Sequence, residues 1–427
     1  MSQRIAGTGV FNNPSRRHHG RVEIKAERLL ADLDALAEVG DTGDGGNCRL
    51  ALTDDDAGGR ELVVGWMRGL GLEVVVDRIG NVVATRAGRE PDLDPVMTGS
   101  HIDTVRTGGR YDGTLGVLAG LEVLRALDEA DVRTRRPLAV AFFTDEEGSR
   151  FAPDMLGSLV YAGGMALEDA LGMVGIDDAV LGDELERIGW AGEAAVPGPA
   201  PHAYVELHIE QGPLLEEQGV TIGAVTGVQG ISWQELTLTG QANHAGTTPM
   251  RLRRDAGYVA AEVATYVRRL ARQLGGHQVG TVGRLDLHPD LVNVVAAHAT
   301  LTVDLRNTDE AVLAESEWRL REHVDRVARD EGVEASWRRL ARFEPVAFDP
   351  GVIALVERAA SDRGHRVIRL PSGAGHDAQM LARMCPAGMV FVPSRAGVSH
   401  NPAEFTEPEH LAAGTQVLAD VLVELAS

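Results

Sequence analysis

The chain has 427 residues, and 44% of them are hydrophobic, which is enough for a sizeable core and for two domains. Its formal net charge of −22 argues against nucleic acid and anionic membranes as partners, because either would require basic patches. The cysteines Cys48 and Cys385 lie far apart without a CxxC motif, and no run has the length of a membrane span, so a cytoplasmic protein is predicted.

The first 150 residues alternate between helix and strand signals. Residues 1–20 are polar and are predicted to form a flexible tail. Residues 22–39 and 60–70 carry apolar side chains at helical spacing, and strand-length runs follow at 72–76 and 82–84. Residues 137–144 (PLAVAFFT) are apolar throughout, as is typical of parallel strands covered on both faces. The pattern predicts an α/β fold with a central, mostly parallel sheet.

Residues 97–127 combine a strand end, a polar loop and a leucine-rich helix. The strand delivers His101 and, two residues later, Asp103. Asp112 follows behind Gly108 and Gly109, whose conformational freedom lets the loop fold back toward His101. Imidazole and carboxylate ligands suit zinc or a neighbouring first-row ion, and one carboxylate can bridge two ions. The alternative is that these polar residues only cap a loop beside an ordinary helix.

Two later strands also end in polar side chains. Glu146 and Glu147 follow the apolar strand at 137–144 and point in opposite directions, so that one can bind a metal while the other faces water. A solvated charge pair is the alternative. In the strand at 202–212, alternation places Tyr204, Glu206 and His208 on one face. His208 is therefore a candidate ligand, or an ordinary partly buried histidine.

The pattern changes near residue 219 and changes back near 341. Between them the chain reads as strand (231–238), helix (255–274), strand (299–305) and helix (309–327), a compact α+β insert. After it come a helix at 352–360 and a strand at 389–392, with His376 and His400 in Gly/Ser loops of the kind that often carry function. We therefore predict a discontinuous metal-binding catalytic domain (21–219 and 341–427) and an inserted domain (220–340).

Six candidate residues fall on strands, at strand ends or in the loops beyond, where open α/β sheets bind ligands. They are His101, Asp112, Glu146, Glu147, His208 and His400. This inventory suits a dinuclear site with one bridging carboxylate, its ions roughly 3.5–4 Å apart.

The chain also resembles the metal-dependent amidase/hydantoinase/carbamoylase family of the dinuclear aminoacylase-like peptidases. The motifs that carry the resemblance lie in the family's order between residues 99 and 405. They are GSHIDTVRTGGRYDG, TDEEGSRF, ELHIEQGP, NHAGTTPMRLRRDA, VNVVAAHATLTVDLR, GAGHDAQ and SHNPAEF. The chain departs from the family pattern at Ala296 and Ala297, where Pro-Gly is usual.

The resemblance implies a zinc-peptidase-like catalytic domain, a lid and dimerisation domain, and two divalent ions per subunit, with zinc first and manganese, cobalt or nickel as alternatives. The implied metal ligands are His101, Asp112 as the bridge, Glu147, His208 and His400. Glu146 is implied as the catalytic base, and His244 as a residue that reaches the partner subunit's active site in a homodimer. The implied substrate contacts are Asn293 and Arg306 at a carboxylate, and Gln211 and His376 at a ureido group.

The family hydrolyses ureido or amide C–N bonds of small carboxylates. Our first choice is an N-carbamoyl-L-amino acid amidohydrolase, and the alternative is allantoate amidohydrolase or ureidopropionase, whose motifs would look nearly the same. An N-acyl amino acid deacylase is disfavoured by Gln211, for which a peptide-like substrate has no evident use. A non-catalytic metal-binding or ligand-binding protein is disfavoured by Glu146, the residue that such a protein is free to lose.

Overall fold

The structure is a computed structural model, and it describes residues 22–427, so the tail predicted at 1–20 lies outside the described residues. The helices are α1 (Ala26–Ala37), α2 (Asp54–Gly69), α3 (Thr114–Glu129), α4 (Leu156–Tyr161), α5 (Leu167–Leu171), α6 (Leu181–Arg187), α7 (Leu214–Gln218), α8 (Ala256–Leu274), α9 (Glu310–Glu331), α10 (Pro350–Asp362), α11 (Asp377–Leu381) and α12 (Pro408–Leu425). None of the described helices is both long and apolar enough to cross a membrane.

The strands form two separate sheets. They are β1 (Glu73–Val76), β2 (Val82–Arg86), β3 (Val96–His101), β4 (Leu138–Phe143), β5 (Ala203–Ile209), β6 (Ile222–Val228), β7 (Gly230–Thr239), β8 (Val279–His288), β9 (His298–Asn307), β10 (Glu334–Phe343), β11 (Val346–Ala347), β12 (Val367–Ser372) and β13 (Ala387–Val392). The larger sheet has the order β1-β2-β4-β3-β5-β13-β6-β11, with β12 paired to β6, and the smaller has the order β10-β7-β9-β8.

The larger sheet is parallel at its centre, where β4, β3, β5 and β13 pair side by side. Its core strands are buried on both faces, which explains the solidly apolar run of β4. On β5, the predicted alternation is present: the Leu207 side chain packs near Gly414 of α12, while Glu206 on the other face accepts from the backbone N–H of Ala378 in α11. The predicted α/β class with a mostly parallel central sheet is confirmed.

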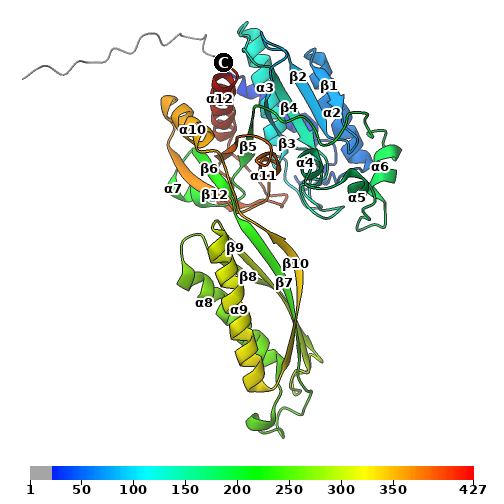
Figure 1. The fold of residues 1–427 in the computed structure, drawn as a ribbon, viewed down its shortest axis with the longest axis vertical. Helices are drawn as coiled ribbons and strands as arrows, with labels where there is room; N and C mark the ends of the chain where they lie inside the picture. The colour runs from blue at the N-terminus through cyan, green and yellow to red at the C-terminus, as the bar shows by residue number, and fades with distance from the viewer. Residues whose placement is uncertain (1–21) are drawn as a thin grey trace, which may run out of the picture.

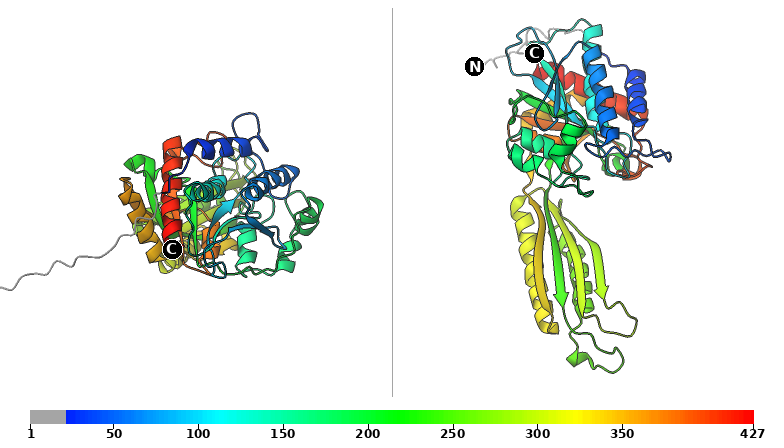
Figure 2. Two further views of the ribbon diagram at one scale, coloured as in Figure 1. Left: turned by 90° about the horizontal axis from the view of Figure 1, so that it is seen from above. Right: turned by 90° about the vertical axis from the view of Figure 1, so that its right-hand side faces the viewer.

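The smaller sheet projects from the larger body as an elongated unit, with α8 and α9 on one face (Figures 1 and 2). Its own core lies between these helices and the sheet. Helix α8 is capped by Asp255, whose carboxylate accepts from the N–H groups of Gly257 and Tyr258. Two lateral contacts join the bodies: Gln229 Nε2 donates to the His277 carbonyl, and Arg306 Nη1 donates to the Gly373 carbonyl.

Three features differ from the sequence-based expectation. The insert contains four strands rather than two, because β8 and β10 form the outer edges of the sheet and are largely exposed, without a clear buried face. The alanine-rich sequence of residues 165–190 predicts a helical stretch, which the structure divides into two short helices, α5 and α6, joined by a turn. Strand β6 belongs to the larger sheet, so the chain crosses between the sheets at Gln229, beyond the expected boundary at residue 220.

Candidate metal centre

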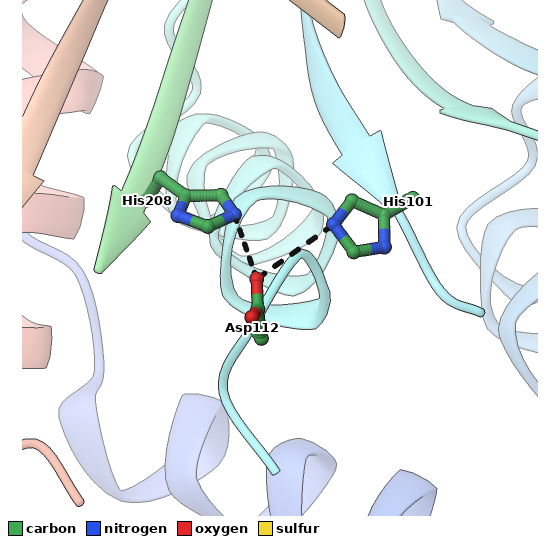
Figure 3. A group of neighbouring side chains, drawn as sticks. All are labelled: His101, Asp112 and His208. Carbon is green, nitrogen blue, oxygen red and sulfur yellow. Dashed lines mark ion pairs between the residues drawn. The ribbon is translucent and has the colours of Figure 1, made fainter. Parts of the chain in front are cut away.

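The carboxyl ends of β3 and β5 place two imidazoles near one oxygen of Asp112. His101 ends β3, His208 lies on the adjacent parallel strand β5, and Asp112 lies in the loop before α3, between the two rings (Figure 3). Asp112 Oδ1 is 3.1 Å from His208 Nε2 and 3.8 Å from His101 Nε2. These three residues form one potential metal-binding group, and all three are buried.

The second oxygen of Asp112 faces a second group. Asp112 Oδ2 lies 3.3 Å from His400 Nε2, which in turn lies 3.4 Å from Glu147 Oε2. Asp112, Glu147 and His400 form another potential metal-binding group. The two oxygens of the Asp112 carboxylate thus face two different ligand sets, which is the arrangement required of a bridging ligand.

The histidine rings are oriented by their other nitrogen. His101 Nδ1 lies 2.9 Å from the Asp103 carbonyl, and His208 Nδ1 lies 2.9 Å from the Ile209 carbonyl. A hydrogen bond from Nδ1–H to a carbonyl leaves the Nε2 lone pair for a metal, as is usual for ligating histidines. Gly113 has φ +66°, and a Cβ there would lie 2.3 Å from His101 Nε2, so only glycine fits beside this ring.

The electrostatics of the group fit divalent cations. Burial and then neighbouring carboxylates, Asp377 and Asp112 respectively, raise the pKa of Glu146 and Glu147 well above the usual range of a glutamate. Burial lowers the pKa of His101 to about 4, which favours the neutral imidazole that a metal requires. A cation would offset the cost of several buried carboxylates in one place, so the donor set fits a metal centre.

Other predicted residues line the same cavity, which has a volume of about 220 Å³. Gln211 Nε2 donates to Asp112 Oδ2 over 2.8 Å, and Glu146 Oε2 lies 3.4 Å from His101 Nε2. The cavity brings together nine of the predicted residues, namely His101, Asp112, Glu146, Glu147, His208, Gln211, Arg306, His376 and His400.

His244 and Asn293 do not line this cavity. Both are exposed, and they lie side by side, since the N–H of Ala245 donates to the Asn293 carbonyl. They lie beyond the end of β7 that is distant from the larger body (Figure 1). Ile231, near the start of β7, lines the cavity, and Thr239 ends the strand eight residues later, roughly 26 Å away at ~3.3 Å per residue. A single chain therefore does not bring His244 to its own metal centre.

Sequence reasoning missed Glu404, and it singled out Asp103, Gly108 and Gly109 for roles that differ from those in the structure. Asp103 is no part of either metal-binding group; its carboxylate accepts from the backbone N–H groups of Glu146 and Glu147, each at 3.3 Å. Gly108 and Gly109 do not have positive φ, and Gly109 instead leaves room for Glu404, since a Cβ there would lie 2.1 Å from Glu404 Oε1. The one acidic residue of the SHNPAEF motif was the available signal for Glu404.

Glu404 joins the two loops that carry Asp112 and His400. Its Oε1 accepts from the N–H groups of Tyr111 and Asp112 at 3.0 and 3.2 Å, and its Oε2 accepts from Ser399 Oγ at 2.8 Å. Ser399 Oγ also lies 3.1 Å from Asp112 Oδ2. Glu404 therefore fixes the position of Asp112 from the far end of the sequence.

We expect Glu404→Ala to destabilise the protein, because it leaves buried N–H groups without an acceptor at a cost of roughly 1–3 kcal/mol each. Urea unfolding of the metal-free protein measures the effect. Glu407→Ala is the matched control, since that carboxylate pairs with Arg395 at the surface and an exposed pair contributes only about 0–1 kcal/mol. Equal losses in the two variants would contradict the role given to Glu404.

Comparison with known proteins agrees with this geometry. Residues 97–424 match the model of peptidase family M20/M25/M40. The chain is 41% identical over 403 residues to an N-carbamoyl-L-amino-acid amidohydrolase of Rhizobium meliloti, covering 94% of this chain and 97% of that protein. It is 34% identical over 408 residues to allantoate amidohydrolase of Bacillus subtilis strain 168, covering 95% of this chain and 99% of that one.

A solved structure is similar over nearly the whole chain. The crystal structure of an amidase of the hydantoinase/carbamoylase family from Burkholderia multivorans superimposes with a TM-score of 0.93 at 46% identity, covering 95% of this chain and 98% of that chain. The similarity therefore includes both sheets as well as the cavity.

Proposed function

The chain belongs to peptidase family M20/M25/M40, and from that premise we propose that it hydrolyses the ureido C–N bond of N-carbamoyl-L-amino acids to the amino acid, CO2 and ammonia. The observation that carries the proposal is the placement of two ligand sets on the two oxygens of Asp112, in one cavity with Gln211 and Arg306. Curated relatives of that activity are 36–41% identical over most of the chain, which supports the same reaction.

Two divalent ions are proposed as cofactors, with zinc first and manganese, cobalt or nickel as alternatives. His101 and His208 would hold one ion, Glu147 and His400 the other, and Asp112 both. When bound, such ions polarise a carbonyl group and lower the pKa of water. This mixed nitrogen and oxygen ligand set is one that several first-row ions accept.

The chain's own residues would supply the proton transfer and the contacts with the substrate. Glu146 lies within the cavity and is placed to take a proton from the attacking water and to deliver one to the leaving nitrogen. Arg306 would bind the substrate carboxylate through the N–H groups that Asp304 and Gly373 leave free. Gln211 and His376 would contact the ureido group on the opposite side of the cavity.

A homodimer is proposed because His244 lies far from its own chain's cavity. Strand β8 is an edge of the smaller sheet and exposes Val279, Leu285 and Leu287, which offers a surface for a second copy. We also keep the prediction of a cytoplasmic location, with Cys48 and Cys385 as free thiols.

We expect activity to return when inactive Glu146→Gln subunits are mixed with inactive His244→Ala subunits. A mixed dimer would contain one intact cavity facing an intact His244, so up to half of its sites would work. Ammonia release after verified subunit exchange measures the effect, and His298→Ala, an exposed histidine of the same sheet, should be active without mixing. Mixtures that exchange subunits yet stay inactive would place His244 outside the partner's site.

Allantoate amidohydrolase is the second candidate, supported by the similarity to the enzyme of Bacillus subtilis. A panel that contains allantoate and several N-carbamoyl-L-amino acids, assayed by ammonia release, separates the two. The same assay after chelation and after return of each metal tests the cofactor. Unchanged turnover in a metal-free protein would contradict the proposed dinuclear centre. A protein that releases no ammonia from any ureido compound would contradict the proposed substrate class.

A further inference from the structure

One carboxylate of the cavity belongs to neither ligand set. Asp154 lines the cavity together with Trp233, Arg306 and Gly375, on the side where the substrate carboxylate is expected. It lies in the loop between β4 and α4, eight residues after Glu146. Its position therefore depends on the same loop that carries the proposed base.

Short backbone contacts hold Asp154 in place. The N–H of the next residue, Met155, donates to the Glu146 carbonyl at 2.6 Å, and the N–H of Leu156 donates to the Asp145 carbonyl at 3.2 Å. A methyl group on Gly375 would lie 3.5 Å from Asp154 Oδ2, so this oxygen also approaches the loop that carries His376. The carboxylate is thus confined between two loops of the metal centre.

Asp154 has acceptor capacity that the described protein does not use. Among residues 22–427, the only hydrogen bond recorded for its carboxylate comes from its own backbone N–H. Burial raises the pKa of Asp154, and the charge of Arg306 lowers it. Arg306 donates elsewhere, because its Nε and Nη2 donate to Asp304 at 2.8–3.1 Å and its Nη1 donates to the Gly373 carbonyl at 2.6 Å. In the proposed reaction its two remaining N–H groups bind the substrate carboxylate.

A bound substrate can supply a donor to Asp154. In the proposed reaction the ureido group lies at Asp112 and the carboxylate at Arg306, so the α-carbon lies between them. The side chain on the α-carbon then faces the remaining wall of the cavity, to which Asp154 contributes. Asp154 is half-buried, so a bound substrate would cover its carboxylate. An acceptor covered without a donor costs roughly 1–3 kcal/mol, and a second negative charge beside it is repelled.

We propose that Asp154 determines specificity, by accepting a hydrogen bond from an N–H group on the substituent at the substrate's α-carbon. The preferred substrates then carry an amide, ureido or ammonium group there, and apolar or acidic substituents of the same size are poor substrates. The inference rests on the proposed ureido hydrolysis and adds to it the chemical class of the substituent.

The test compares N-carbamoyl derivatives of L-asparagine, L-leucine and L-aspartate, which have side chains of similar size, with allantoate as a substrate that has a second ureido group. The wild-type kcat/KM for the asparagine derivative should exceed that for the leucine derivative by roughly 5- to 150-fold, the equivalent of one buried hydrogen bond. Asp154→Leu should reverse this order. Asp154→Asn, which is isosteric and removes the charge, should most improve the aspartate derivative.

Binding supplies a second readout. Calorimetric titration of the same compounds into the Glu146→Gln protein, in the presence and absence of Asp154→Leu, should show the same order of Kd values without turnover. Asp92→Asn, at an exposed aspartate outside the cavity, is the control and should leave the order unchanged. Circular dichroism confirms that each variant is folded.

Two results would overturn the inference. One is a wild-type protein that treats the asparagine and leucine derivatives alike while hydrolysing both. The other is an equal loss for all substrates in Asp154→Leu, which would mean that Asp154 contacts the ureido group they share. A protein that neither binds nor hydrolyses any ureido compound would instead refute the proposed function, and the inference with it.

Discussion

Asp112→Ala should remove both metal ions at once and reduce turnover to background. One oxygen of Asp112 faces His101 and His208 and the other faces His400, so no other side chain here serves both ligand sets. The fall in metal affinity should be larger than the roughly 10- to 100-fold that is typical when a hydrogen-bonding partner of a metal ligand is removed. Elemental analysis should give about two ions per chain in the wild-type protein and close to none in the variant.

His400→Ala is the matched control for Asp112→Ala. His400 lies near Asp112 Oδ2 and Glu147 and belongs to one of the two ligand sets, so its loss should weaken one ion and leave the other in place. Near-ultraviolet circular dichroism checks that the loop before α3 keeps its structure in both variants. Retention of two ions by folded Asp112→Ala would show that the carboxylate is not a bridge.

Glu146→Gln should hold both ions yet lose turnover by ~10² to 10⁴, the usual contribution of a positioned proton-transfer group. Neither potential metal-binding group around Asp112 includes Glu146, although its carboxylate is buried in the same cavity. Steady-state kinetics should therefore show a fall in kcat with a nearly unchanged KM. Elemental analysis of the same sample reports the metal content.

Glu147→Gln separates the two neighbouring glutamates. Glu147 lies 3.4 Å from His400 and belongs to a metal-binding group, so this variant should lose metal, and an excess of metal should restore part of its activity. The backbone of both glutamates is held by the same residue, since Asp103 accepts from both N–H groups. If the two variants lost metal to the same extent, the division between base and ligand would be wrong.

The candidate ligands could be predicted because each follows a strong local signal. His101 ends a strand, Glu146 and Glu147 follow an apolar one, and parallel strands present their carboxyl ends at one edge of a sheet. The outer strands β8 and β10 could not be predicted in this way. They are edge strands with little buried surface, so their sequences lack the apolar alternation that marks a strand with one buried face.

The supporting residues depend on contacts between distant parts of the chain. Glu404 accepts from Tyr111 and Asp112, almost three hundred positions earlier, and nothing local to Glu404 indicates these partners. The loop glycines were correctly singled out for the wrong reason. Gly109 leaves space for Glu404, whereas the glycine with positive φ in this loop is Gly113.

The sequence by itself determined the α/β class of this protein, the residue types of its candidate metal centre and the strands that deliver them, because hydrophobic periodicity and short motifs are local properties. Only the tertiary structure decided which oxygen of Asp112 faces which histidines, that Asp154 lies in the cavity with spare acceptor capacity, and that His244 lies at the far end of β7. These facts depend on how the strands pair and how the loops close over them. Their physical cause is long-range packing, which no short window of the sequence contains.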